Sequence, residues 1–421
     1  IWSHLFCVTD DISDDTKVEV DRFASQFALY RGIAEAVTQV VISLFLGSWS
    51  DKHGNKLPLL LPLLGYNIQA CLNIMFSYLP DLPPEYLLIS SIPVGLSGGF
   101  AAMVLSAFSY ISSVSTMEHR SYRIAIMEAM WFLGNPIGTL VGARLYKDLG
   151  FHGVYIASAA LNFCAFMYGL FFIRDKKMKI DNLSTCCTDM FNVSAVNDTF
   201  RTVFKKRDGS RRKWILLLIG GVCLRIGSLF GPHNCMFLFV RYMFQWNEQQ
   251  YSLLATLEGV SHVVGGIIMT VVCIRILQLS DPLVGVLSSV GLIVANIVVA
   301  SAPKDPDYSW VMYLSLVLQM FALMATIISR SMLSKMVPQE ELGKIFTFVA
   351  CGETSMPILA SALYSTIFIN TEKDFPGAFS LLSLGLNTLI AINFLYFFIL
   401  IRRNPEVLMF NAKEKKESNV L

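Results

Sequence analysis

The sequence predicts an all-α protein that crosses a membrane many times. Of its 421 residues, 54% are hydrophobic and only 15% are charged, whereas about a quarter of the residues of a soluble domain carry a charge. The mean hydropathy is +0.55. A helix needs about 20 apolar residues to cross the hydrocarbon layer, and runs of that length recur along the chain with short polar gaps between them.

Eleven apolar runs predict eleven membrane-spanning helices. In chain order these runs are 27–49, 57–80, 85–112, 122–146, 150–173, 214–240, 250–275, 282–302, 309–333, 345–370 and 377–401. The run 250–275 is the weakest of them, because it contains several glycines.

The segments outside these runs alternate between ones rich in Lys and Arg and ones that carry few of these basic residues. One set carries Lys52 and Lys56, Arg120 and Arg123, a dense basic group within 174–213, and Arg402 with Arg403. Loops rich in Lys and Arg face the cytoplasm, so this set is predicted to be cytoplasmic. The acidic segment at the start then faces the outside or a lumen, and a further helix is expected before it in the full protein.

This topology divides the chain into five parts. They are an outer loop (1–26), a first helix bundle (27–173), a cytoplasmic loop (174–213), a second bundle (214–403) and a cytoplasmic tail (404–421). With the helix expected upstream, each bundle holds six helices. That organisation resembles the major facilitator superfamily, in which substrate binds near the midplane between two halves.

The turn Gly47–Lys56 resembles the signature loop G-x-x-x-D-x-x-G-R-[RK] of that superfamily. Gly54 permits a tight turn, Asp51 can interact with the N-terminus of a neighbouring helix, and Lys56 faces the cytoplasm. The resemblance implies that these residues form a gating loop. Asn55 replaces the signature's arginine, so one charged contact of the loop is absent.

The run Gly134–Gly142 carries small residues on one helix face, and Pro136 is predicted to bend this span. Small residues allow helices to approach closely. The run loosely resembles a Gly-Pro motif of facilitator helix 5, and ordinary helix packing explains it equally well.

A closer resemblance connects segments from the whole chain. Leu46–Lys52, Arg120–Ala129, Leu333–Val337, Gly343–Phe346 and Val349–Cys351 together resemble the solute carrier 46 family, the family of the proton-coupled folate transporter. The resemblance implies proton-coupled transport of an organic anion. Two departures concern folate: Gly99 and Ser91 stand where the folate transporter has an acidic residue and an arginine, so the chemistry for binding folate is not intact.

Glu128 is the strongest candidate for proton coupling. A charged group at the centre of a membrane helix costs about 2.5–3.5 kcal/mol, so its presence calls for a function. A carboxyl group in an apolar environment favours its neutral form and can take up and release a proton near neutral pH. Glu128 also aligns with the glutamate that the resembled family uses for this purpose. The alternative is a structural hydrogen bond or an interfacial carboxylate.

Three further charged residues are candidates for substrate binding. Arg225 lies near the middle of its helix and could contact an anion or pair with Glu258 or Glu353. Arg330 aligns with an arginine of the resembled family that takes part in substrate binding and coupling, although an interfacial arginine is an equal alternative. Glu353 lies in mid-span and is a candidate for substrate binding or for proton coupling.

Glu258 and His262 are four residues apart and therefore share a helix face. A carboxylate beside an imidazole suits a proton relay, because histidine titrates near neutral pH. The family's functional histidine aligns with Gly259 instead. Arg31 and Glu35 have the same spacing, and for them a local ion pair is the favoured interpretation.

The sequence therefore predicts a proton-coupled symporter of an organic anion in the plasma membrane or an endolysosomal membrane. A proton-driven exporter or antiporter of the same fold and a non-transporting receptor are the alternatives. The expected partners are a small organic anion and the bilayer, without nucleic acid. No enzymatic activity is expected, since the sequence has no His-Asp acyltransferase pair and no phosphate-binding glycine loop. No metal is expected, since the nine cysteines have no metal-binding spacing, and no cofactor apart from the coupling proton is expected.

Overall fold

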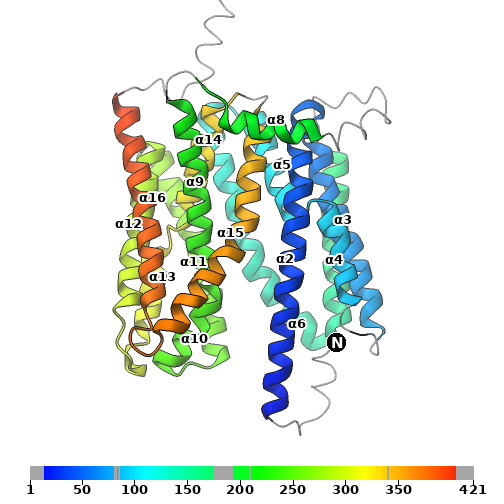
Figure 1. The fold of residues 1–421 in the computed structure, drawn as a ribbon, viewed down its shortest axis with the longest axis vertical. Coiled ribbons are helices and arrows are strands. Elements are labelled where there is room, and N and C mark those ends of the chain that lie inside the picture. Colours follow the sequence, from blue (N-terminus) through cyan, green and yellow to red (C-terminus); the bar gives the residue numbers. More distant parts are fainter. Residues whose placement is uncertain are drawn as a thin grey trace, which may run out of the picture. The chain divides into compact units, whose positions relative to one another are not determined.

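The computed structural model describes residues 14–79, 83, 86–173, 193–207, 210–338 and 341–403, and for residues 14–30 it describes the backbone alone. Within these ranges every regular element is a helix (Figure 1). The prediction of an all-α membrane protein is confirmed.

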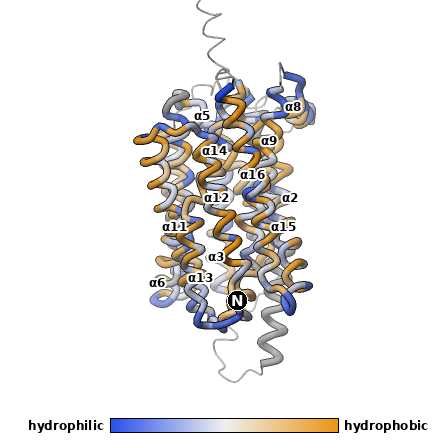
Figure 2. The backbone as a smooth tube through the Cα atoms, turned by 90° about the vertical axis from the view of Figure 1, so that its left-hand side faces the viewer, coloured by the Kyte–Doolittle hydropathy of each residue, from blue (hydrophilic) through white to orange (hydrophobic). Residues whose placement is uncertain are grey.

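Ten segments of the described chain are helical, long and apolar enough to cross a membrane. They are Lys56–Ser77, Leu87–Val114, His119–Gly142, Arg144–Phe172, Arg211–Phe230, Gln250–Ile276, Asp281–Ala300, Pro306–Met336, Leu342–Thr371 and Ala378–Arg403. Figure 2 shows long hydrophobic stretches along the helices, with hydrophilic residues near their ends. The remaining predicted span, 27–49, lies within helix α2 (Asp14–His53), which is not among the ten.

The chain folds as two compact units. The first unit contains the chain up to Tyr110 together with Leu140–Phe200, and the second contains Ile111–Thr139 together with the chain from Arg201 onward. The segment 111–139 thus joins the second unit, although it precedes the predicted cytoplasmic loop 174–213.

In the first unit, α4 (Leu87–Leu96) packs against α2 and α3 (Lys56–Ser77). The single span expected over 85–112 is two helices, α4 and α5 (Gly99–Val114). They are separated at Gly98 and Gly99, whose φ angles are +80° and +42°. A Cβ atom at Gly99 would lie 2.6 Å from the side-chain amide carbon of Gln39, so the break also allows a close approach.

Helix α6 (Met117–Phe172) combines two predicted spans, 122–146 and 150–173. Its non-helical residue is Gly150, with φ of 66° and ψ of −164°, whereas the helix continues through Pro136. The close packing expected at Gly134, Gly138 and Gly142 is not found in the described part of the chain, because a Cβ atom at each of them would meet no described atom of another segment within 4 Å.

The second unit contains most of the remaining helices. In chain order they are α9 (Arg211–Phe230), α10 (His233–Phe244), α11 (Glu248–Met269), the π-helix η2 (Thr270–Ile276), α12 (Asp281–Ala300), α13 (Trp310–Gln319), α14 (Leu323–Met336), α15 (Leu342–Thr371) and α16 (Ala378–Arg403). Helix α12 packs against α13, α14 and α16, while α9 packs against α14, α15 and α16. Helix α9 therefore contacts α14 and α15, which carry two of the three residues of the charge cluster described below.

Aromatic side chains fill the core of this unit near α10. The ring of Phe379 lies 5.3 Å from that of Phe239 and 6.0 Å from that of Phe368, in edge-to-face arrangements. Such pairs contribute about 0.5–1.5 kcal/mol beyond the burial of their area. Beside them, the buried Tyr364 hydroxyl shares a 2.7 Å hydrogen bond with Ser383.

The polar ranges predicted at the ends and in the middle of the chain are described only in part. Helix α2 begins at Asp14, inside the predicted outer loop 1–26, and α8 (Val193–Phe204) forms inside the predicted loop 174–213. Residues 174–192 and the predicted tail 404–421 lie outside the described residues.

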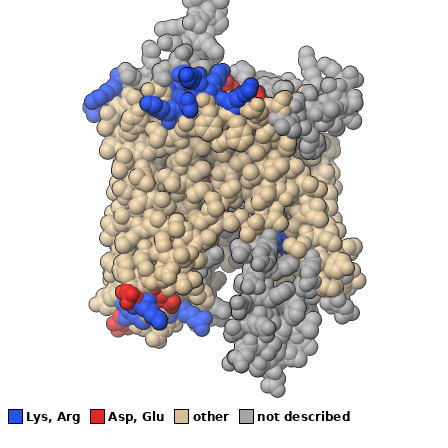
Figure 3. All heavy atoms as spheres, viewed as in Figure 1, with Lys and Arg blue, Asp and Glu red and all other residues tan. Residues whose placement is uncertain are grey.

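In the part of Figure 3 formed by α9–α16, at the left, Lys and Arg gather at the upper end and both charge signs occur at the lower end. Helix α16 carries Arg402 and Arg403 in its last turn. The segments near Asp305 and Lys373 connect helices at the opposite end. The assignment of this basic end to the cytoplasm stays a prediction from the positive-inside rule.

Candidate functional site: a buried charge cluster and a serine–lysine–aspartate network

A guanidinium group shared by two carboxylates lies inside the second unit. Arg330 of α14 donates from Nη1 to Oε1 of Glu128 on α6. Its Nε donates to Oε1 of Glu353 on α15 at 3.1 Å, and its Nη2 contacts the same oxygen. The three residues are only 3–4% exposed, and each sits on a helix of membrane-spanning length.

This cluster, formed by Glu128, Arg330 and Glu353, carries one more acid than base. A buried charge needs pairing and hydrogen bonding to be tolerated, and Arg330 supplies both to the two carboxylates. With both acids ionised, one negative charge remains unbalanced, and one proton would neutralise it. Oε2 of Glu353 is buried and has no hydrogen-bond partner among the described residues. The arrangement is chemically suited to holding and releasing a proton.

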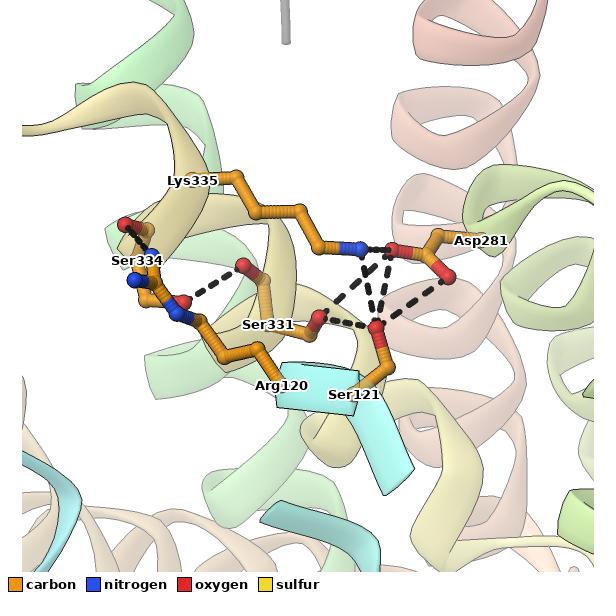
Figure 4. A network of polar contacts seen from close by, with 6 residues as sticks. All are labelled: Arg120, Ser121, Asp281, Ser331, Ser334 and Lys335. Carbon is orange, nitrogen blue, oxygen red and sulfur yellow. Dashed lines mark hydrogen bonds and ion pairs between the residues drawn. The ribbon is translucent and has the colours of Figure 1, made fainter. Parts of the chain in front are cut away.

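A second polar network links α6, α12 and α14 (Figure 4). Lys335 donates to Oδ2 of Asp281 at 2.5 Å and to the Ser121 hydroxyl at 2.9 Å. The hydroxyls of Ser121 and Ser331 lie 2.6 Å apart. Nearby, Arg120 donates from Nη1 to the carbonyl oxygen of Ser334 at 2.7 Å.

Sequence reasoning missed this serine–lysine–aspartate network, formed by Ser121, Asp281, Ser331 and Lys335. Ser121 and Lys335 entered only as members of the segments Arg120–Ala129 and Leu333–Val337, and none of the four residues was a candidate for the site. Asp281 is the one visible signal, because it places an acid at the start of a helix next to a basic loop. Its partners are 50, 54 and 160 residues away in the chain, and no local pattern connects them.

Arg225 of α9 lies apart from both groups. Its side chain is 2% exposed, and its Nε donates to the carbonyl oxygen of Ala322 at 3.3 Å. Neither of the predicted alternatives, pairing with Glu258 or with Glu353, is found as an ion pair among the described residues. Nη2 of Arg225 has no hydrogen-bond partner there.

Glu258 and His262 lie on α11, as their spacing predicted, but no hydrogen bond joins their side chains within the described structure. His262 is 4% exposed, and its Nε2 has no hydrogen-bond partner among the described residues. Glu258 lines a pocket together with Arg225 and His233. The structure thus places the predicted relay residues on one helix without a direct contact between them.

The predicted gating loop is partly described. Gly54 has φ of 102°, and its amide donates to the carbonyl oxygen of Ser50 at 2.9 Å. Lys56 Nζ donates to the carbonyl oxygen of Leu170 at 2.6 Å. The positive φ explains the need for glycine in this turn. The side chain of Asp51 lies outside the described ones.

Two other expectations concern local chemistry. Arg31 Nε and Glu35 Oε1 form the expected i,i+4 ion pair at 3.0 Å on α2. Among the described residues no group of three or more His, Cys, Asp or Glu side chains could hold a metal ion.

Comparison with known proteins identifies the family of the chain. The family model for the Major Facilitator Superfamily matches residues 32–361. A Drosophila melanogaster protein described as "Probable peptidoglycan muropeptide transporter SLC46" is 24% identical, covering 89% of this chain and 74% of that protein.

Two vertebrate relatives belong to the same solute carrier family. The mouse "Lysosomal proton-coupled steroid conjugate and bile acid symporter SLC46A3" is 28% identical, covering 89% of this chain and 80% of that protein. The bovine "Proton-coupled folate transporter" is 24% identical, covering 86% of this chain and 77% of that protein. The resemblance to the solute carrier 46 family is therefore confirmed.

A solved structure shows the same fold. The human organic anion transporter MFSD10 superposes with a TM-score of 0.69 at 16% identity, over 87% of this chain and 83% of that one. The helical architecture, the family model and the relatives agree: this chain is a multi-pass membrane protein that belongs to the Major Facilitator Superfamily.

Proposed function

We propose that this protein is a secondary active transporter that couples the uptake of an organic anion to the movement of a proton by alternating access. The single observation that carries the proposal is the sharing of Arg330 by two buried carboxylates. The mouse and bovine relatives are described as proton-coupled, one for steroid conjugates and bile acids and one for folate. Since the relatives are transporters, a non-enzymatic function is favoured.

In the proposed cycle, a proton enters from the acidic outside or lumen and binds Glu128. Protonation removes the unbalanced negative charge of the cluster and weakens the hold of Glu128 on Arg330. The neutral cluster then permits the occluded state to form with the anion bound. Opening toward the cytoplasm releases the anion and the proton together. The proton is the coupling ion, and no other cofactor is required.

The available driving force sets the expected accumulation. One unit of pH gradient supplies about 1.4 kcal/mol for each proton that crosses, which sustains about a tenfold concentration ratio of substrate. A carrier that has lost coupling should only equilibrate its substrate across the membrane.

The test uses proteoliposomes containing the full-length protein, with the imposed pH difference as the variable. Labelled folates, steroid conjugates and peptidoglycan fragments are offered in turn, and uptake is compared with and without the gradient. Glu128→Gln should abolish accumulation driven by pH, because the amide cannot take up the proton. Exchange of labelled for unlabelled substrate should persist in this variant, because exchange requires no net proton movement.

Asp374→Asn serves as the matched control, since Asp374 is an exposed acid in the turn between α15 and α16. It should accumulate substrate as the unmodified protein does. The proposal is wrong if Glu128→Gln still accumulates substrate with the same dependence on pH. Uptake that increases when the gradient is reversed would instead identify an exporter or antiporter.

A further inference from the structure

A pocket with a mixed polar and apolar lining lies inside the second unit, among helices that do not contribute to the buried charge cluster. Residues of α9, α10, α11, α12, α13 and α16 line it. Its volume is about 60 Å³, which holds a few water molecules or a small polar head group. None of Glu128, Arg330 and Glu353 contributes to this lining.

Arg225 provides the positive charge of the pocket. Arg225 is only 2% exposed and lines the pocket. Its Nε donates a hydrogen bond to the carbonyl oxygen of Ala322. Its Nη2 has no hydrogen-bond partner among the described residues. An unpaired guanidinium is costly in a buried position, so a negatively charged group in the pocket would complete its hydrogen bonding.

Glu258 provides the negative charge. It reaches the pocket from α11, and none of the basic side chains in the described part of the chain forms an ion pair with it. In particular, no nitrogen of Arg225 lies within 4.0 Å of a Glu258 carboxylate oxygen. The pocket therefore presents a guanidinium group and a carboxyl group, with the His233 imidazole in the same lining, and no direct contact joins the guanidinium to the carboxyl group.

The neutral polar groups of the pocket are partly committed to other bonds. Ser228 accepts a hydrogen bond from Asn387 at 2.8 Å, and Ser383 is joined to Tyr364 at 2.7 Å. These contacts fix the orientation of the two serines beside Arg225. Gln319 of α13 and Asn296 of α12 add amide groups to the lining.

We propose that this pocket binds a head group of amino-acid type, with its carboxylate at Arg225 and its ammonium at Glu258. A simple anion would satisfy Arg225 but would lie in the same small pocket as the Glu258 carboxylate. A simple amine would pair with Glu258, but its positive charge would lie in the same small pocket as the Arg225 guanidinium. A group carrying both charges pairs with both side chains, through charge-assisted hydrogen bonds that are the strongest kind available here.

The inference rests on the proposed function in one respect, because the head group is taken to be part of the transported anion. Binding itself requires no proton gradient, so the two proposals can fail separately. A variant at Glu128 should lose accumulation and keep the ligand selectivity of this pocket.

The test measures thermal unfolding of the purified full-length protein in detergent, followed by tryptophan fluorescence. The probes are glycine, β-alanine and γ-aminobutyrate, compared with acetate, propionate and butyrate and with the amines of the same lengths. At least one of the amino acids should raise the unfolding midpoint in a saturable manner. Its affinity should exceed that of the matched acid and the matched amine by about tenfold or more.

Charge-neutral variants then assign each end of the ligand. Arg225→Gln should abolish protection by the amino acids. Glu258→Gln should remove the selectivity, so that butyrate protects as well as γ-aminobutyrate does. Arg241→Gln, at an exposed position in the last turn of α10, should behave as the unmodified protein, and Glu128→Gln should retain the selectivity.

The inference is overturned if the monoacids protect the unmodified protein as well as the amino acids, which would show a simple anion site, or if none of the amino acids protects it. This comparison needs no variant and remains decisive should Arg225→Gln fail to fold. Undiminished protection of a folded Arg225→Gln protein would also overturn it.

Discussion

Replacing Arg330 by glutamine should destabilise the protein strongly, because the change removes the only described cation between two buried carboxylates. Arg330 contacts Glu128 through one nitrogen and Glu353 through two. All three side chains are at most 5% exposed, so water cannot replace the lost partner. Removing one member of a buried ion pair typically costs about 3–5 kcal/mol, and we expect a loss in this range for Arg330→Gln at neutral pH.

The loss should depend on pH in a defined direction. Acid adds protons to the two carboxylates and removes their mutual repulsion, so the variant should lose less stability at mildly acidic than at neutral pH. Adding Glu353→Gln to Arg330→Gln should restore part of the stability at neutral pH, because a single carboxylate then remains. The unfolding midpoint in detergent, measured over a series of pH values, reports both effects.

Arg241→Gln again provides the control, since it removes an exposed arginine from the same unit. It should change stability by no more than about 1 kcal/mol, as exposed charges do. If Arg330→Gln were equally mild, or if its loss were independent of pH, the three side chains would not form the buried cluster described above.

Three further predictions concern other parts of the chain, and each is measured by thermal unfolding. A double-mutant cycle with Asp281→Asn and Lys335→Gln should show a coupling energy of about 0.5–3 kcal/mol, and additive effects would contradict their 2.5 Å contact. Gly231→Ala should cost about 1–3 kcal/mol, since its Cβ would lie 2.5 Å from a tyrosine ring carbon. Gly385→Ala should be nearly neutral because no described atom outside its own helix backbone would lie within 4 Å of the added Cβ, and equal losses in the two variants would refute the reasoning. Gly54→Ala should cost about 1–3 kcal/mol because φ is +102°, and a neutral effect would show that the turn relaxes.

Much of the fold could be predicted from the sequence because hydropathy reports directly on burial in a bilayer. The predicted spans 57–80, 282–302 and 377–401 correspond closely to α3, α12 and α16. The breaks inside spans were harder to predict. The span 309–333 divides into α13 and α14 within an apolar run that has no glycine or proline, so composition gives no sign of the interruption.

The candidate site was predictable residue by residue but not as an assembly. Glu128, Arg330 and Glu353 each stood out because a charge within a membrane span is costly. Their mutual contact joins positions 202 and 23 residues apart, which is set by helix packing and has no local signature. The spacing of Glu258 and His262 predicted a common helix face correctly, while the direct contact that a relay needs is not found among the described residues.

Helix α14 carries Arg330 of the charge cluster and Ser331 and Lys335 of the serine–lysine–aspartate network within about a turn and a half. A helix this short moves as a rigid rod, so a rotation or translation that withdraws the guanidinium from its acids also shifts the ammonium relative to Asp281. The free energies of the two groups of contacts are therefore linked. Protonation of the charge cluster that displaces α14 would change the stability of the Lys335–Asp281 ion pair at the basic end of the helix. By reciprocity, weakening the Lys335–Asp281 ion pair would change the affinity of the charge cluster for a proton.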